Sequence, residues 1–143
     1  MSIFKDMEGY SGTPLAKKLG IKDGFTLFLV NVPNHYKSLF IDIPVNTKEV
    51  KRPKLESVDF VHVFCTVEKD FKKYLPKVKA ALKKDGMIWV SWPKGTSKIA
   101  TNINREAVRD YMLSQIGLVD IKVASIDADW SGLKFVYRKD DRN

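Results

Sequence analysis

A chain of 143 residues with 44% hydrophobic and 11% aromatic content is about one domain long and has enough apolar residues for a core of its own. Its single cysteine, Cys65, excludes an internal disulfide and a multi-cysteine metal site, and we assign no metal to the chain. No apolar run approaches the roughly 18 residues of a membrane span, so we expect no membrane partner.

The net charge of +8 raises the question of a nucleic-acid partner. Most of the excess is lysine, whereas arginine is the residue suited to bidentate contacts with phosphates and bases. Many of the lysines lie in the amphipathic stretch 69–84, where a solvated helix face explains them without a partner. Nucleic acid is therefore a disfavoured partner. The first residues, MSIFKDMEGY, lack the apolar stretch of a secretory signal, so we expect a cytoplasmic protein.

The N-terminal part of the sequence predicts one short helix. Residues 1–8 have no clear period and are expected to form an arm of a single domain that spans 1–143. Thr13 and Pro14 are typical of a helix start, because a hydroxyl can cap the first turn and proline loses nothing at the first helical position. Gly20 is typical of a left-handed helix stop.

A buried strand and a poorly defined connection follow. Residues 25–30, FTLFLV, form a continuous apolar run, which is typical of a parallel strand buried on both faces. A second short helix is expected from Pro33 to about Phe40. Residues 41–55 predict a loop with at most one weak edge strand, because two prolines interrupt them.

The middle of the chain predicts a strand and a long helix. Residues 58–65, VDFVHVFC, form a second buried strand, and Thr66 is the expected cap of the helix that follows. Pro76 predicts a kink or a break in this helix, and the pair Asp85-Gly86 is its expected end.

The last third predicts a strand, a helix and a hairpin. Residues 87–92, MIWVSW, form the strand, and Asn104 is the expected cap of a helix that ends before Gly117. Residues 118–126 and 133–138 are joined by a short connection and should pair as antiparallel strands. Together these elements predict an α/β fold: a single three-layer, Rossmann-like domain whose sheet is mostly parallel, with an antiparallel C-terminal hairpin strand.

The strings LKKDGMIWVSWPK and GLVDIKVASIDADWSGLKFVYR resemble the second half of a class I methyltransferase. This resemblance implies that the last strand lies reversed between its two neighbours. The family's cofactor-binding residues lie in the first half, where this sequence differs: Asn31-Val32-Pro33-Asn34-His35 replaces the glycine-rich turn, and no acidic residue ends a second strand to hold a ribose. We therefore predict no cofactor, and S-adenosylmethionine is disfavoured.

Four further strings cover nearly the whole chain: GYSGTPLAKKLGIK, DFVHVF, KDGMIWVSWPK and DWSGLKFV. Together they are similar to a family of small bacterial proteins that is catalogued as a domain of unknown function. The resemblance implies one conserved domain and no particular catalytic residue.

Ligands of open parallel sheets bind outside the carboxyl ends of the strands, and this rule selects the candidate site. We expect one shallow crevice there, with two indoles, hydroxyls and an ammonium group, suited to a small anionic or planar ligand. The alternative is that both tryptophans close the core. The candidate residues are Asn31, Cys65, Thr66, Ser91, Trp92, Lys94, Trp130 and Ser131.

A cysteine at the end of a buried strand can act as a nucleophile if a base lies nearby. His62 is three residues before Cys65, so its side chain should point to the opposite face of the sheet, which leaves His35 as the possible base. His62 is expected to be a core histidine bonded to a backbone carbonyl, and Cys65 a small buried hydrophobe.

Three hypotheses about function follow. The first is a non-catalytic module that binds a small ligand or a protein. The alternative is an enzyme, either a divergent S-adenosylmethionine-dependent methyltransferase or a transferase that uses Cys65. The third is a nucleic-acid-binding protein, which rests on charge alone. A homo-oligomer is possible if the last strand lies at an edge of the sheet.

Overall fold

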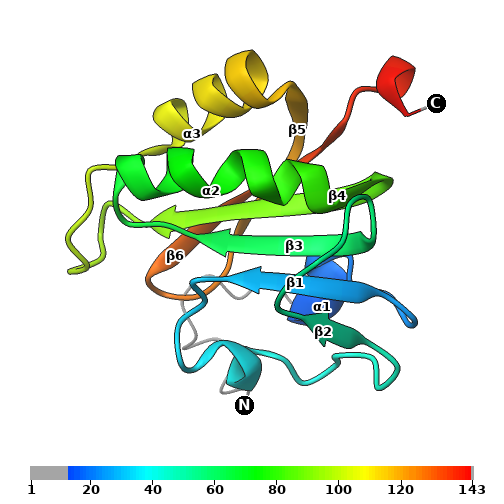
Figure 1. Ribbon diagram of the computed structural model, residues 1–143. Coiled ribbons are helices and arrows are strands. Elements are labelled where there is room, and N and C mark those ends of the chain that lie inside the picture. The colour runs from blue at the N-terminus through cyan, green and yellow to red at the C-terminus, as the bar shows by residue number, and fades with distance from the viewer. Residues whose placement is uncertain (1–12, 143) are drawn as a thin grey trace.

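A six-stranded sheet forms the middle of the protein, in the order β2-β1-β3-β4-β6-β5 (Figure 1). The computed structural model describes residues 13–142. Strands β2, β1, β3 and β4 run parallel, and β6 runs antiparallel to both β4 and β5. The predicted fold class is therefore confirmed, with the reversed strand between its two neighbours. The strands are β1 (Thr26–Val30), β2 (Lys48–Val50), β3 (Val58–Phe64), β4 (Leu82–Pro93), β5 (Leu118–Ser125) and β6 (Trp130–Tyr137).

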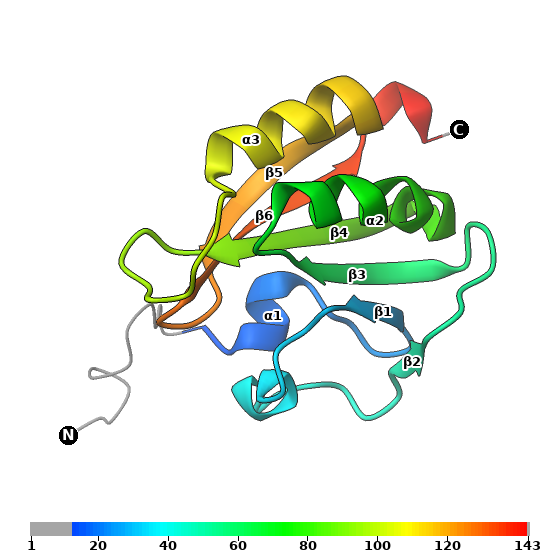
Figure 2. The ribbon, with the colours of Figure 1, turned by 60° about the vertical axis from the view of Figure 1, so that its left-hand side comes forward.

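Helices cover both faces of the sheet and complete the three layers (Figure 2). One face, called the α2 face below, packs against α2 (Glu68–Ala81) and against α3 (Arg105–Tyr111), which the π-helical turn η3 (Met112–Ile116) continues. The opposite face, the α1 face, is covered by α1 (Leu15–Leu19) and the single 3-10 turn η2 (Tyr36–Leu39). A last 3-10 turn, η4 (Lys139–Asp141), ends the described chain.

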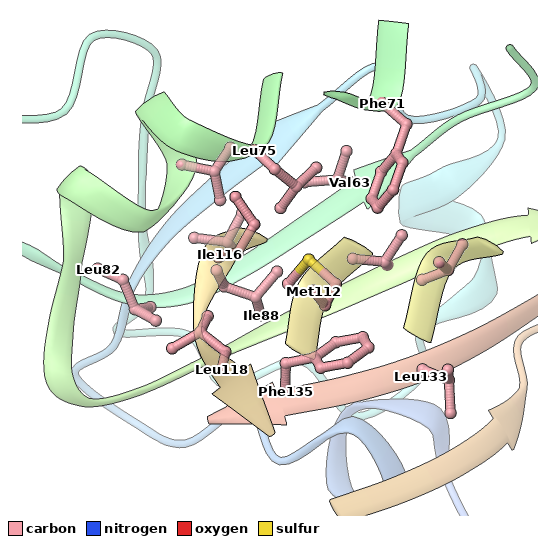
Figure 3. Packing of buried hydrophobic residues seen from close by; sticks show 14 of the residues in the cluster. Val63, Phe71, Leu75, Leu82, Ile88, Met112, Ile116, Leu118, Leu133 and Phe135 are labelled. Atoms are coloured by element: carbon pink, nitrogen blue, oxygen red, sulfur yellow. The ribbon is translucent and has the colours of Figure 1, made fainter. Parts of the chain in front are cut away.

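The core on the α2 face is the larger of two hydrophobic clusters. Phe71 and Leu75 of α2 and Met112 of η3 point at the sheet, where Ile88 and Phe135 meet them (Figure 3). All five are fully buried, and burial of each such side chain stabilises the fold by about 1.5–3 kcal/mol. The helical spacing of apolar residues in α2 and α3 thus fixes which way both helices face.

One helix start is capped by its own neighbour and the other by a distant segment of the chain. Asn104 caps α3 as predicted, since its Oδ1 accepts the N–H of Ala107 at 2.9 Å. The expected Thr66 cap is wrong: α2 starts after Val67, and the N–H of Glu68 instead donates to Asn102 Oδ1 at 2.8 Å. A segment that follows β4 therefore holds the start of α2.

The helix α2 and strand β4 meet earlier than the sequence suggests. Pro76 lies inside α2 without breaking it, and the helix ends at Ala81 instead of at the Asp85-Gly86 pair. Strand β4 begins at once with Leu82, which pairs with Val58 before the register shifts. Gly86 fits this irregularity because a Cβ there would lie 2.7 Å from Leu82 Cδ1 and 2.9 Å from the Asp59 carbonyl oxygen.

The edges of the sheet differ from one another. The weak edge strand expected within 41–55 is present as β2, which pairs with the first half of β1. The last strand, β6, lies inside the sheet, and β5 forms the other edge. Oligomer formation through the last strand was expected only if that strand lay at an edge of the sheet, and β6 does not lie at an edge. No helix within residues 13–142 is long and apolar enough to cross a membrane.

Candidate functional site

The chain reverses its direction of travel across the sheet at β1. From β1 it passes first to β2 on one side and then to β3 on the other, and the arrowheads of β1, β3 and β4 point the same way (Figure 1). Open α/β sheets bind ligands at such a switch point, outside the carboxyl ends of the strands. The residues that follow β1, β3 and β4 here, beginning at Asn31, Cys65 and Lys94, are called the rim below.

Asn31 makes the turn that leaves β1. Its φ of 57° lies in the left-handed region, which asparagine tolerates better than most residues, so the tight turn forms without glycine. Its Nδ2 amide donates to the carbonyl of Phe64 at 2.9 Å. One exposed side chain thus joins the ends of β1 and β3 across the switch point.

The loop after β1 also reaches the turn between β5 and β6. His35 Nε2 lies 3.0 Å from Asp127 Oδ2, and the two residues are separated by 92 positions in the sequence. Asp127 Oδ1 accepts the N–H groups of Asp129 and Trp130, which fixes the carboxylate in the turn. Since β3 and β4 lie between β1 and β6, this contact spans the ends of both strands.

Tyr36, the next residue after His35, begins a hydrogen-bonded chain of three buried side chains. The Tyr36 hydroxyl lies 2.9 Å from His62 Nδ1, and His62 Nε2 lies 2.8 Å from Ser91 Oγ. Burial raises the pKa of Tyr36 and lowers the pKa of His62 to about 3, so both are neutral near pH 7. His62 is a core histidine as expected, but its partners are two hydroxyls instead of a backbone carbonyl.

Cys65 and Thr66 follow β3 with different exposure. Cys65 is 1% exposed and belongs to the core on the α2 face, opposite to His62. Burial, with a smaller effect of Asp70, raises the pKa of its thiol to about 12, so the thiolate is disfavoured. The half-buried Thr66 offers its carbonyl, which accepts bonds from Thr101 Oγ1 and from the N–H of Asn102.

The two tryptophans do not share a crevice, which corrects the predicted geometry. Trp92 pairs with Ser131, whereas Trp130 pairs with Pro93, one position further along β4. Because neighbouring positions of a strand point to opposite faces, Trp92 packs into the core on the α2 face and Trp130 into the core on the α1 face. Both are more than nine-tenths buried, so they close the core as in the alternative interpretation.

The remaining candidates lie at the carboxyl end of β4 and near it. Ser91 is fully buried and bonded to His62, so it does not line the surface. Ser131 is half-buried beside Trp92. Lys94 Nζ donates to Ser125 Oγ, at the end of β5, at 2.6 Å. Of the eight predicted residues, Asn31, Thr66, Lys94 and Ser131 offer polar groups near solvent.

Two cavities lie away from the β1–β3 switch point. The larger, of about 520 Å³, is an open hollow between the loop after β4 and the β5–β6 turn, lined by Thr96, Lys98, Ile99, Ala128 and Asp129. The smaller, of about 330 Å³, lies on the α1 face beside β1 and β2 and is mostly apolar. Neither contains a group of three or more potential metal ligands, and residues 13–142 form no such group elsewhere.

Sequence reasoning missed three of these features. The pairing of His35 with Asp127 and of Tyr36 with His62 depends on where η2 lies, and no period or motif reports that position. His35 and Tyr36 do follow the first strand, and α/β folds often place ligand contacts in that loop. The third missed feature is that Lys18 and Lys94, which are far apart in the sequence, both bond to Ser125.

The fold is that of known methyltransferases. A Sulfolobus solfataricus protein assigned to the type 11 methyltransferases superposes with a TM-score of 0.63 at 15% identity, over 89% of this chain and 91% of that one. The Burkholderia thailandensis 1,6-didemethyltoxoflavin-N1-methyltransferase, solved with S-adenosylhomocysteine, gives 0.56 at 8% identity, over 85% and 73% of the two chains. Aeropyrum pernix fibrillarin, with natively bound S-adenosyl-L-methionine, gives 0.55 at 13% identity over the same shares, 85% and 73%. No protein-family profile matches the chain, and no curated protein is similar to it in sequence.

These structures correct the prediction that no cofactor is bound. Proteins with this fold were solved with S-adenosylmethionine or S-adenosylhomocysteine, so the missing glycine-rich turn is not sufficient to exclude such a compound. At these identities the likeness establishes the fold alone.

The described residues fit the family's usual way of holding an adenosyl group only in part. Asn31 preserves the tight turn after β1, but its amide already bridges to Phe64. Strand β2 ends at Val50, opposite Phe28 of β1, and two basic residues follow it, so no carboxylate stands where the family holds its ribose. We therefore derive no methyl-transfer step from this geometry.

Proposed function

We propose that this chain is a divergent protein of the methyltransferase fold that binds an S-adenosyl compound at the rim, near the ends of β1 and β3. The observation that carries the proposal is the switch point itself, where β1 lies between β2 and β3. Ligands of open α/β sheets bind at this position. Support also comes from proteins of the same fold, at low identity, that hold S-adenosylmethionine or its demethylated product.

The chain's own residues suggest a mode of binding different from that of the family. Asn31 carries both a donor and an acceptor on its side chain, and its exposed position lets them exchange the bond to Phe64 for one to a ligand. Thr66, at the end of β3, offers a hydroxyl next to it. We expect these two residues to replace the glycine-rich turn and the ribose-binding acid.

A second candidate is a module that binds a ligand without catalysis. The observation in its favour is that the nucleophiles near the rim are withdrawn from solvent: Cys65 and Ser91 are both buried, and the pKa of Cys65 is raised. This disfavours a transferase that uses Cys65. It does not affect methyl transfer, in which the protein need not supply a nucleophile.

Isothermal titration of the protein with S-adenosylmethionine and with S-adenosylhomocysteine tests the proposal. We expect saturable binding of at least one of them, and a loss of about tenfold or more in affinity in the variant Asn31→Ala, which removes a hydrogen-bonding side chain from the rim. Thr66→Val should weaken binding in the same direction.

Glu56→Ala is the matched control. Glu56 is the other non-glycine residue with a positive φ, at 46°, and it precedes β3, at the opposite end of that strand from the rim. This variant also places alanine in the left-handed backbone region, without touching the site. If neither compound binds at millimolar concentration, or if Glu56→Ala weakens binding as much as Asn31→Ala does, the proposed site is wrong.

A further inference from the structure

The connection between β1 and β2 covers the α1 face only in part. A crossover between two parallel strands usually contains an α-helix that packs on the sheet. Here residues 31–47 link β1 to its parallel neighbour β2, and their regular structure is the four-residue turn η2 (Figure 2). A cavity of about 330 Å³ is left beside the two strands, and we call it the β1–β2 pocket.

The inner side of this pocket is apolar and well fixed. Leu27 and Leu29 of β1 form it together with Ile21 and Tyr36. Ile21, Leu27 and Tyr36 are more than nine-tenths buried, and the Tyr36 hydroxyl lies 2.9 Å from His62 Nδ1. A ligand would therefore meet side chains whose positions the core already sets.

The outer wall is the loop that leads into β2, and hydrogen bonds attach it to the rest of the fold. Asp42 accepts the N–H groups of Ala16 and Lys17 with its two carboxylate oxygens, at 3.0 Å each. Asn46 Nδ2 donates to Asp23 Oδ2, shortly before β1, at 3.2 Å. The pocket is thus formed without a ligand, which lowers the conformational cost of binding.

Apolar side chains of this loop are left in contact with water. Ile43 and Val45 line the pocket, and they are 40% and 93% exposed. An apolar body placed against them and against the inner side would remove hydrophobic surface from water. The volume lies in the range of small-molecule sites, about 300–1,000 Å³, which are mostly apolar with a few polar or charged groups.

Glu49 supplies a carboxylate to the lining of the pocket. Its side chain lies on the α1 face of β2, because Glu49 pairs with Leu27, and it is 28% exposed. The largely exposed Lys37 and Lys51 approach it with N–O distances of 3.1 and 3.8 Å. The charge also reaches the inner side, since the pKa of Tyr36 is raised by burial and then by Glu49. The pocket therefore favours a positive charge near Glu49.

The ion pairs of Glu49 can be exchanged at low cost. Pairs that involve exposed lysines contribute little to stability, because water solvates the ammonium group when the pair separates. A salt bridge that ties η2 to β2 is a structural explanation for the contact between Lys37 and Glu49. It does not explain the apolar cavity beside that contact.

We propose that the β1–β2 pocket binds a small organic amine. The apolar body of the ligand lies against Leu27, Leu29 and Tyr36, and its ammonium group takes the place of Lys37 at the Glu49 carboxylate. Such a charged hydrogen bond is stronger than a neutral one and orients the ligand. Because the pocket lies on the α1 face and away from the rim, the inference does not depend on binding of an S-adenosyl compound there.

Calorimetric titration with three compounds that share a phenyl ring tests the proposal. Phenethylamine carries a positive charge, phenethyl alcohol carries none, and hydrocinnamate carries a negative charge. We expect saturable binding of the amine at millimolar or lower concentration, about tenfold weaker binding of the alcohol, and weaker binding still of the acid. The proposal is wrong if the amine does not bind, or if the alcohol or the acid binds as tightly as the amine.

The variant Glu49→Gln tests the position of the ammonium group. It keeps the shape of the side chain and removes its charge, so it should weaken binding of phenethylamine about tenfold and leave that of the alcohol within about twofold. The matched control is Glu106→Gln, which removes the same charge from an exposed position in the first turn of α3, on the other face of the sheet. Equal losses in the two variants would overturn the proposal.

The variant Lys37→Met should change the affinity in the opposite direction. It removes the cation that competes for Glu49, so phenethylamine should bind about threefold or more tightly. Lys69→Met, at an exposed position of α2, has the same net charge and is the control. If the amine binds Lys37→Met no more tightly than Lys69→Met, the proposal is wrong. Lys37 and Glu49 lie at the surface, so melting temperatures close to that of the unchanged protein should show that both variants are folded.

Discussion

The amide of Asn31 holds the carbonyl of Phe64, so a side chain spans the switch point that separates β1 from β3. In a glycine-rich turn the backbone itself is free to approach a ligand at this point. Here the left-handed conformation is kept, and the side-chain amide is bonded to the strand end of β3. A ligand that uses the Asn31 amide must therefore break this bond, and the contribution of the bond can be measured without the ligand.

Two glycine variants separate the hydrogen bond of Asn31 from its backbone strain. Asn31→Gly keeps the left-handed turn and loses the bond to Phe64, so we expect the free energy of unfolding to fall by about 1 kcal/mol. Glu56→Gly relieves the same kind of strain at a position whose side chain bridges no strands, so it should be neutral or stabilising by up to about 1 kcal/mol. Urea denaturation of both variants measures the difference, and equal effects would mean that the Asn31 bridge contributes nothing.

Because of His62, the free energy of unfolding should decrease as the pH is lowered through a defined window. Its pKa is lowered from the usual 6.5 to about 3 in the folded protein, so the unfolded chain takes up a proton that the folded chain does not. The contribution of His62 is fully present above pH 6.5 and is lost as the pH falls toward 3, at up to about 1.4 kcal/mol per pH unit. Urea denaturation at several pH values measures this slope.

The control for this slope is His62→Gln, because carboxylates also take up protons at the acid end of the window. The variant has no titrating group at position 62, and the glutamine amide can still bond to the hydroxyls of Tyr36 and Ser91. Between pH 6.5 and 5 its stability should change less than that of the unchanged protein. The same slope in both would show that the buried histidine is not the cause.

Cys65 should be unreactive while the protein is folded. Its thiol is 1% exposed and its pKa is raised to about 12, so both access and thiolate formation are disfavoured. Iodoacetamide at pH 7.5 should label the chain at a rate that tracks unfolding, and urea should restore the reactivity of an ordinary cysteine. Fast labelling of the folded protein, measured by mass spectrometry, would return Cys65 to the candidates for catalysis.

Much of the fold could be predicted because its elements carry local patterns. The apolar runs of β1 and β3 identify these segments as strands, and the glycines after α1 and η3 mark where the helices end. The start of β4 was missed because Leu82 continues the helical spacing of Phe71, Leu75 and Val78, although it is extended and pairs with Val58. Pairing with a distant strand outweighed the local pattern there.

The candidate site was harder to predict, because the strand register and the sheet face on which each side chain lies determine which residues meet. Trp92 and Trp130 lie on the neighbouring strands β4 and β6, but a shift of one position in pairing puts them on opposite faces. His62 could be placed in the core, whereas its bond to Tyr36 required the position of η2. Lys18 and Lys94 both bond to Ser125 from distant parts of the sequence, and only the packing of the elements shows this.

At the register shift between β3 and β4, the close approach of the two strands leaves no room for a side chain at Gly86. A Cβ at position 86 would lie 2.7 Å from Leu82 Cδ1, 2.9 Å from the carbonyl oxygen of Asp59 and 3.1 Å from that of Val58. The side chain can move, but the two backbone atoms belong to the paired strand, so Gly86→Ala should lower the free energy of unfolding by about 1–3 kcal/mol. Gly95→Ala is the control, because nothing lies within 4 Å of a Cβ there and alanine is expected to be neutral or slightly stabilising. Thermal and urea denaturation of the two variants measure the contrast; if Gly86→Ala were as stable as Gly95→Ala, the close packing of β3 against the start of β4 would be wrong.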